Sequence, residues 1–485
     1  MATRDELWTW SGVDLAASIR RGDISAREAV QSCLQRLEEV NPTINAVVDV
    51  MAEEALDAAD HADKARCEGG ELGSLHGVPV TIKINVDYKG RPTTSGVVAF
   101  ANRIAQHDST TVTNLRKAGA IIFGRTNVPA FSHRYFTDND LHGRTFNPWD
   151  KGRTPGGSSG GAAAAVATGI GPLAHGNDRA GSVRHPAYCC GVSGLRPSFG
   201  RVPDYLPPGV EEQGLTSQFT FAHGVLARHV RDVKIGFEAL AAPEPRDPWS
   251  GPVVTPADPK PGRVAMFQND PSADIDPAMP AAIRTAAHWL EDAGYEVEEV
   301  APPHFNEAVS LFWTLLMTEE RAASLKERAS STRIIEQFGD EAVKRVRKGT
   351  MAAASQLDYN GYIKAIARRT TILGEWLEFF ERYPLLIMPV CWQRAWVVDH
   401  DQGGGYAVVK SMAVAHGPML AVSVLGLPGM SVPTGLDDGV PMGVQLVAGR
   451  FQEHVIFAAA EAIEKRAAMR LPIAPIGAAP SIKYA

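Results

Sequence analysis

The sequence predicts an α/β fold, in which strands alternate with helices in layers. Residues 78–86 (VPVTIKINV) form an apolar run whose only charge is Lys83, which is typical of a buried strand. Residues 109–126 (STTVTNLRKAGAIIFGRT) predict a serine-capped helix, a glycine stop and a second strand. Residues 262–300 give a strand, a helix and another strand. Such alternation is typical of helices packed on a sheet.

Helices are expected before the first strand. Two precede residue 50, and the second begins at Ser25 and Glu28, which have the spacing of a capping box. Pro42 is expected to end this helix, because proline lacks the amide donor. A third helix is predicted over residues 51–66. The apolar residues of the second helix fall on one face: Val30, Cys33, Leu34 and Leu37.

The second half of the chain is predicted to begin with a connection and to return to the sheet at its end. Residues 243–262 are rich in proline and read as that connection. Residues 305–382 are predicted to be mostly helical and contain many phenylalanines and tryptophans. A strand over residues 443–449 and a helix over residues 453–466 close the prediction.

Composition limits the classes of function. The chain has 485 residues, a net charge of −7 and no stripe of lysine and arginine, so a nucleic-acid surface is not expected. We find no signal-peptide pattern and no apolar run of membrane-spanning length. The five cysteines fit neither a zinc site nor a CxxC pair, which favours a reduced, cytoplasmic setting without a bound metal. Length alone suggests about three domains, or one large α/β domain.

Several short motifs compete for the chemistry. Residues 156–160 (GGSSG) match the G-x-S-x-G elbow, but the loop-like NPWDKGRTP before them is not the strand that this motif requires. Residues 169–174 (GIGPLA) lack the βαβ context of a dinucleotide site. Cys189 and Cys190 are candidate nucleophiles, although small core residues are the commoner reading of such a pair.

Lys83 is the more informative residue. Its apolar flanks place it in a buried strand, from which a lysine either extends to the surface or loses its charge. Lowering its pKa from about 10.4 to about 7 requires roughly 4–5 kcal/mol of penalty on the charged form, which burial can supply. A neutral Lys83 would be able to accept a serine proton.

Together these stretches make the chain resemble the amidase signature family. The likeness includes GVPVTIKINVDYKG, the long segment from TDNDLHGRTFNPWDKG through GGSSGG to GNDRAGSVRHPAYCCGVSGLRPSFGRV, and a C-terminal stretch beginning LGLPGMSVPTGL. The resemblance implies one large α/β/α sandwich around a twisted mixed sheet, spanning residues 1–485. Its expected parts are 1–70 (N-terminal helices), 71–240 (core with the catalytic residues), 241–304 (strand–helix–strand extension), 305–382 (helical pocket segment) and 383–485 (return to the sheet).

The resemblance also implies a Ser–cis-Ser–Lys triad that hydrolyses amide-type bonds through an acyl-enzyme, with no cofactor. On this chain the nucleophile is Ser182, the cis-serine is Ser158 after Gly157, and the base is Lys83. The resemblance draws the oxyanion-hole donors from backbone amides of the loop that is bare of bulky side chains: Arg179, Ala180, Gly181 and Ser182.

Two residues depart from the family pattern. Ala180 stands where a second glycine is usual, and its β-carbon is acceptable only if its φ is negative. Arg179 stands where a small or apolar residue is common, and it either binds an anionic substrate or points to solvent. No further cluster of lysine and arginine accompanies Arg179 in the sequence.

The expected substrate is a neutral apolar or aryl amide, acylamide or carbamate, with esters as a further option. The glycine-rich residues 399–407 are a candidate loop over the ligand. The alternative function is an amidotransferase-type subunit that releases ammonia within a multi-chain transfer-RNA charging complex. We expect a monomer or homodimer without a nucleic-acid or membrane partner. Besides Arg179, the aromatic pocket candidates are Phe312, Trp313, Trp392 and Trp396, whereas Trp376, Phe379 and Phe380 are read as either lid or helix core.

Overall fold

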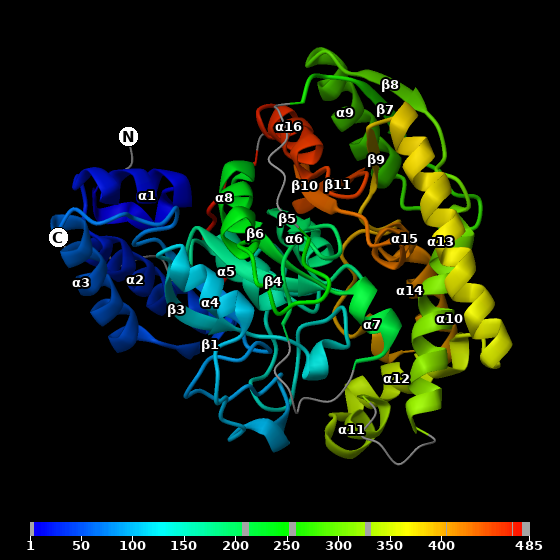
Figure 1. Cartoon of the computed structure of the whole chain (residues 1–485), viewed down its shortest axis with the longest axis horizontal. Coiled ribbons are helices and arrows are strands. Elements are labelled where there is room, and N and C mark those ends of the chain that lie inside the picture. The colour runs from blue at the N-terminus through cyan, green and yellow to red at the C-terminus, as the bar shows by residue number, and fades with distance from the viewer. Residues whose placement is uncertain are drawn as a thin grey trace.

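One mixed β-sheet of eleven strands runs through the part of the chain that the computed structural model describes, residues 4–205, 213–251, 259–324, 331–403, 405–467 and 469–477 (Figure 1). The strand order is β1-β3-β2-β4-β6-β5-β10-β11-β9-β7-β8. The strands are β1 (Val47–Val50), β2 (Pro79–Lys83), β3 (Ile121–Thr126), β4 (Leu173–Asp178), β5 (Ser193–Arg196), β6 (Ala222–Ala227), β7 (Arg263–Met266), β8 (Glu296–Glu299), β9 (Leu385–Pro389), β10 (Gly429–Asp437) and β11 (Val440–Ala448).

Sixteen α-helices of the described residues pack around this sheet, which confirms the predicted α/β class. The first eight are α1 (Gly12–Arg21), α2 (Ala26–Ile44), α3 (Ala52–Cys67), α4 (Thr110–Lys117), α5 (Gly160–Thr168), α6 (Arg184–Cys190), α7 (Leu215–Thr220) and α8 (Val230–Leu240). The others are α9 (Ala278–Asp292), α10 (Phe305–Ser324), α11 (Ser331–Phe338), α12 (Glu341–Ala353), α13 (Tyr359–Arg382), α14 (Gly405–Ala415), α15 (Gly417–Leu425) and α16 (Glu453–Glu464).

The centre of the sheet carries Lys83. Strand β2 lies between β3 and β4 and runs parallel to both. All residues of these three strands are buried, as expected for parallel strands covered on both faces. Lys83, the last residue of β2, is therefore held at the carboxyl end of a central strand. Ligand sites of α/β proteins commonly lie at that edge.

Helix α2 ends later than the sequence predicted. Its predicted capping box is present, because Ser25 accepts from the amide of Glu28 and the Glu28 side chain accepts from that of Ser25. However, the helix continues through Pro42, which was expected to end it. Pro42 lies in the last turn, so the hydrogen bond of its own amide is missing but few residues follow it, and the left-handed Asn45 ends the helix instead.

The two ends of the sheet are covered by different parts of the chain (Figure 1). Helices α2 and α3, blue in the figure, pack beside β1–β3. At the other end, residues 305–382 form helices α10 to α13, as predicted. These helices pack with α14 and α15. Residues 252–258 of the predicted proline-rich connection lie outside the described residues.

The aromatic residues of this helical part divide between core and pocket. Trp376 is fully buried and donates its indole N–H to the carbonyl of Pro303 at 2.6 Å. Phe380 and Phe379 pack in the same hydrophobic cluster. These three residues therefore belong to the helix core. Of the two alternatives, lid or helix core, the structure supports the second.

Within the described ranges, no single helix is long and apolar enough to cross a membrane. The bent pair α14 and α15, at 67° to each other, meets the length and composition criteria only when taken together.

Candidate active site

Lys83 is completely buried and faces two polar side chains. Its Nζ lies 2.7 Å from Ser158 Oγ and 2.7 Å from Asn177 Oδ1. Burial lowers the pKa of Lys83 to about 7; Asp178 opposes this shift and the positive charge of Arg179 adds to it. The alternative in which Lys83 extends to the surface is therefore wrong. Near neutral pH a large fraction of this amine is unprotonated and can accept a proton from Ser158.

The glycine-rich loop at residues 156–161 leaves no room for side chains. The Gly157–Ser158 peptide is cis, as the family resemblance implies. A β-carbon on Gly157 would lie 2.3 Å from the carbonyl oxygen of Arg134. Gly156 has a φ of 81°, and a β-carbon there would lie 2.5 Å from Pro186 Cα. The glycines thus allow three backbone segments to meet behind Ser158.

Ser159 connects this loop to the segment that carries Ser182. Its backbone N–H donates to the carbonyl of Ser182 at 3.1 Å, and its hydroxyl donates to the carbonyl of Asn177 at 3.4 Å. Ser158 and Ser182 both line the same cavity. The structure therefore brings together the three residues of the predicted triad: Lys83, Ser158 and Ser182.

A buried carboxylate shapes the turn between β4 and α6. Asp178 accepts hydrogen bonds from the amides of Gly181, at 2.8 Å, and Val183, at 3.1 Å. It also pairs with the guanidinium of Arg184, whose Nη2 lies 2.9 Å from Oδ1. Arginine charges and these hydrogen bonds lower the pKa of Asp178 to about 2 against the effect of burial. The turn is therefore fixed from its inner side by an ionised carboxylate.

The amides of this turn are not equivalent. The Gly181 N–H is used by Asp178 and is not free to meet a substrate oxygen, although it was among the four expected donors. In the described part of the chain, the amides of Arg179, Ala180 and Ser182 have no hydrogen-bond partner. Ala180 has the negative φ that its β-carbon requires. Three of the four predicted backbone donors remain open.

Tyr135, which was not predicted from the sequence, supports the turn from the opposite side. Its hydroxyl donates to the carbonyl of Ala180 at 2.7 Å. Burial raises the pKa of this phenol, so it stays protonated and remains a donor. The ring stacks on His416 with centroids 3.9 Å apart, and His185 packs edge-on against both. A single tyrosine in a loop gives no pattern by which sequence reasoning would find it.

We expect Tyr135→Phe to lower kcat on an amide substrate by about 10-fold with little change in KM. The change leaves the Ala180 carbonyl without its donor, at a cost of about 1–2 kcal/mol, and loosens the amides beside it. Steady-state kinetics and urea unfolding measure the two effects. Tyr406→Phe, at an exposed position in α14, is the matched control. A Tyr135→Phe enzyme with unchanged kcat would show that this hydrogen bond does not position the turn.

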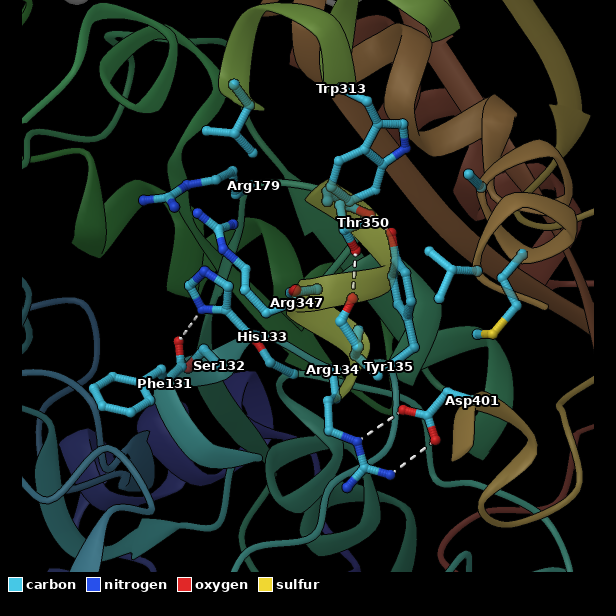
Figure 2. Close-up of a pocket in the computed structure, with 18 of the residues that line it drawn as sticks. Phe131, Ser132, His133, Arg134, Tyr135, Arg179, Trp313, Arg347, Thr350 and Asp401 are labelled. Carbon is cyan, nitrogen blue, oxygen red and sulfur yellow. Dashed lines mark hydrogen bonds and ion pairs between the residues drawn. The ribbon is translucent and has the colours of Figure 1, made fainter. Parts of the chain in front are cut away.

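Ser158 and Ser182 line a cavity of about 320 Å³, which Figure 2 shows. Three predicted pocket residues line it: Arg179, Phe312 and Trp313. The other two lie elsewhere, because Trp392 is fully buried with Phe267 in the core and Trp396 stacks on His400. Further lining residues are Phe131, His133, Arg134, Tyr135, Phe221, Leu316, Val346, Arg347, Thr350, Asp401, Val409 and Met412.

A second arginine, Arg347, lies near Arg179, although the sequence suggested no further cation there. It comes from α12, is buried, and lines the cavity near Arg179. The two arginines are 168 positions apart in the sequence, so no local motif joins them. Only the packing of α12 against the pocket brings them together.

The glycine-rich segment at residues 399–407 is tied to the pocket by ion pairs. Asp401 pairs with Arg134 through two hydrogen bonds of 2.7 and 2.8 Å, which Figure 2 shows at the pocket wall. Asp399 pairs with Arg144 at 2.7 Å. A short 3-10 turn spans His400–Gln402, and Gly404 lies outside the described residues. Of this segment, Asp401 lines the cavity.

Cys189 and Cys190 do not compete as nucleophiles in this structure. Both are fully buried in α6, and burial raises the pKa of each thiol well above its ordinary value. They are small core residues with neutral thiols. Among the described residues, no group of three histidines, cysteines or acidic residues is placed to hold a metal ion.

Comparison with known proteins identifies the family of this chain. The Amidase family model matches residues 28–457. An indoleacetamide hydrolase of Bradyrhizobium diazoefficiens is 45% identical over 463 residues, which cover 95% of this chain and 87% of that protein. A subunit of the glutamyl-tRNA(Gln) amidotransferase of a Cyanothece species is 32% identical over 468 residues, covering 91% and 94% of the two chains.

A solved structure shares the fold across almost the whole chain. It is a bacterial aryl acylamidase of the amidase signature enzymes, with a TM-score of 0.80, 26% identity and coverage of 94% of this chain and 96% of that one. The family model spans the segments that carry Lys83, Ser158 and Ser182. The chain belongs to the amidase signature family and is a hydrolase that acts on amides.

Proposed function

We propose that the protein hydrolyses its amide through an acyl-enzyme on Ser182. The observation that carries this proposal is the 2.7 Å contact between the buried Lys83 amine and Ser158 Oγ in the cavity that Ser182 also lines. Neutral Lys83 accepts the proton of Ser158, and Ser158 accepts that of Ser182 as Ser182 Oγ attacks the carbonyl carbon. Asn177, which accepts from Lys83, orients the amine.

The open amides of the turn would stabilise the charge that this attack creates. The carbonyl oxygen becomes an oxyanion that can accept from the N–H groups of Arg179, Ala180 or Ser182. Each well-placed donor contributes about 3–4 kcal/mol to the transition state. The relay then returns a proton to the departing nitrogen, the C–N bond breaks, and the amine or ammonia leaves. Water repeats the sequence on the acyl-enzyme and releases the acid.

For the substrate we propose a primary amide of an aryl- or alkyl-substituted acetic acid. The indoleacetamide hydrolase relative supports this class, as does the apolar side of the cavity, where Phe312, Trp313 and Leu316 lie. Carbamates and esters of the same acyl shape would be secondary substrates, because the same attack on a carbonyl cleaves them. We propose that residues 1–485 act as one domain in a cytoplasmic monomer or homodimer.

The amidotransferase alternative has less support. The amidotransferase subunit is 32% identical to this chain, against 45% for the indoleacetamide hydrolase, although both alignments cover most of it. The cavity is also lined by bulky aromatic side chains, which suit an apolar acyl group better than the side chain of glutamine. A stand-alone hydrolase is therefore the better proposal.

Hydrolysis of indole-3-acetamide or phenylacetamide by the purified chain tests this function. Burial of a phenyl-sized group contributes roughly 2–3 kcal/mol, so we expect kcat/KM to exceed that for acetamide by about 30- to 150-fold. Release of ammonia gives the rate. A glutaminase assay on the same preparation tests the alternative. Equal or higher kcat/KM on acetamide would contradict the aryl substrate, and turnover of glutamine alone would favour the amidotransferase class.

A further inference from the structure

One wall of the catalytic cavity is cationic. Arg179 follows β4, Arg347 comes from α12, and His133 lies just after the short helical turn Ala130–Ser132. All three side chains line the cavity. Figure 2 shows the two guanidinium groups and the imidazole together on one side, with Trp313 and Tyr135 on the other. The positive charges of both arginines also lower the pKa of His133.

Arg347 already has an acidic partner. Its Nη2 lies 2.9 Å from Glu320 and 2.5 Å from the hydroxyl of Thr332. This pairing neutralises one of the two positive charges of the wall. It also fixes the Arg347 guanidinium beside the space in front of Arg179.

Arg179 has no such partner. Its Nε is completely buried without a hydrogen bond, and over the described residues its guanidinium makes no ion pair. The ring of Phe221 lies 5.9 Å from its central carbon. The other acids that act on Arg179 have partners of their own: Glu319 accepts from Thr216 and Tyr362, and Asp204 faces His223 at 3.1 Å.

This arrangement is costly without a ligand. Arg179 is half-buried, so its guanidinium loses part of its hydration without an ion pair to replace it, and burial accordingly lowers the pKa of Arg179. Arg347 adds a second cation nearby, and each arginine disfavours the charge of the other. Burial and the two arginines lower the pKa of His133 to about 4, so His133 is neutral at pH 7. The charges of Glu320, Asp204 and Glu319 raise the pKa of Arg179 but only partly offset the effect of its burial.

We propose that Arg179, supported by Arg347, binds a carboxylate on the acyl portion of the substrate. The proposal rests on the amide hydrolysis proposed above and narrows its substrate class to amides whose acyl group carries an anion. Guanidinium groups match the planar geometry of a carboxylate and can donate two parallel hydrogen bonds to it. The apolar wall opposite holds the rest of the acyl group. The substrate is thus charged at one end, in place of the wholly neutral amide predicted from the sequence.

The test compares substrates that differ only in this charge. Succinamate and glutaramate are paired with 4-methylpentanamide and 5-methylhexanamide, in which an isopropyl group replaces the carboxylate. We expect the wild-type enzyme to favour the charged member of at least one pair by about 10-fold or more in kcat/KM. Arg179→Met should reduce that charged-to-neutral ratio by about 100-fold, as is typical when one partner of a desolvated ion pair is removed.

Two further variants complete the design. Lys348→Met removes one positive charge from the exposed side of the same helix as Arg347 and should leave the ratio unchanged. Arg179→Gln keeps a donor of smaller size, and it replaces Arg179→Met if the latter does not fold. The proposal would be overturned if the Arg179 variants kept the charged-to-neutral ratio of kcat/KM and changed only the pH dependence of the rate. Arg179 would then act only by lowering the pKa of Lys83.

The outcomes separate this proposal from the one on which it rests. Turnover of phenylacetamide with no preference for the charged amides would overturn the carboxylate site and leave the amidase activity standing. If no amide is hydrolysed, calorimetry with glutarate still tests the site. Binding that Arg179→Met weakens by about 100-fold supports the proposal, and absence of binding to the wild-type protein overturns it.

Discussion

Replacing Ser182 with alanine should lower kcat on any amide substrate by on the order of 10⁴- to 10⁶-fold, because the nucleophile itself is removed. The protein should still fold, since a small hydroxyl at the cavity floor contributes little packing. Release of ammonia measures the rate, and thermal unfolding measures the fold. The predicted acyl-enzyme further implies that a fluorophosphonate probe forms one covalent adduct, on Ser182, in the wild-type protein.

Ser158 provides the matched control for this prediction. Ser158→Ala should lose less activity than Ser182→Ala, because a water molecule can bridge the gap between Ser182 and Lys83. It should also leave Ser182 available to the probe. An adduct on Ser158 or on Cys190 in the wild-type protein, located by mass spectrometry, would contradict the assignment of the nucleophile.

The protonation state of Lys83 should make kcat/KM depend on pH. Only its neutral form accepts a proton, so kcat/KM should rise with pH up to the pKa of about 7 and level off above it. Lys83→Met should lower kcat by about 10³-fold or more and remove this pH dependence. Rate measurements between pH 5 and 10 on both proteins check this. A Lys83→Met enzyme with near-normal turnover would eliminate the lysine as the base.

The same pKa also predicts a change in stability. The pKa of Lys83 is about 7 in the folded protein and 10.5 when unperturbed, so between these values the unfolded chain binds one proton more. The destabilising effect of Lys83 is fully present below pH 7 and is lost as the pH rises to about 10.5. The free energy of unfolding of the wild type, relative to Lys83→Met, should therefore rise with pH by about 1.4 kcal/mol per unit in this window. A difference that does not vary with pH would contradict the lowered pKa.

Local patterns predicted the elements better than their arrangement. The buried strand ending at Lys83 and the capping box at Ser25 were both readable, because each depends on residues within a few positions. Pro42 was misread as a helix end, since its effect depends on how many turns follow it. The order of the strands was not readable at all. Strands β10 and β11 lie between β5 and β9, and nothing in their own residues records those neighbours.

The candidate site divides in the same way. Lys83, Ser158 and Ser182 lie in conspicuous glycine-rich or apolar stretches, so a family resemblance could assign them roles. Tyr135 and Arg347 were missed, because each gains its role only from a distant contact: Tyr135 with the carbonyl of Ala180, and Arg347 with the pocket wall beside Arg179. Trp392 was wrongly placed in the pocket, because an aromatic side chain after a strand has the same pattern whether it faces a cavity or the core.

The position of the C-terminal strands has a consequence for synthesis on the ribosome. Residues 1–240 can assemble one side of the sheet, but β5 then has an open edge until β10 and β11 emerge nearly 200 residues later. In the finished protein Arg184, which pairs with Asp178 under the Ser182 turn, also donates to Gln445 on β11 at 2.6 Å. A nascent chain would thus contain Ser182 long before Gln445 is available to hold Arg184 beneath the Ser182 turn. Such long-range pairing is slow and leaves an edge open to aggregation, so a chaperone is expected to improve the yield of active enzyme.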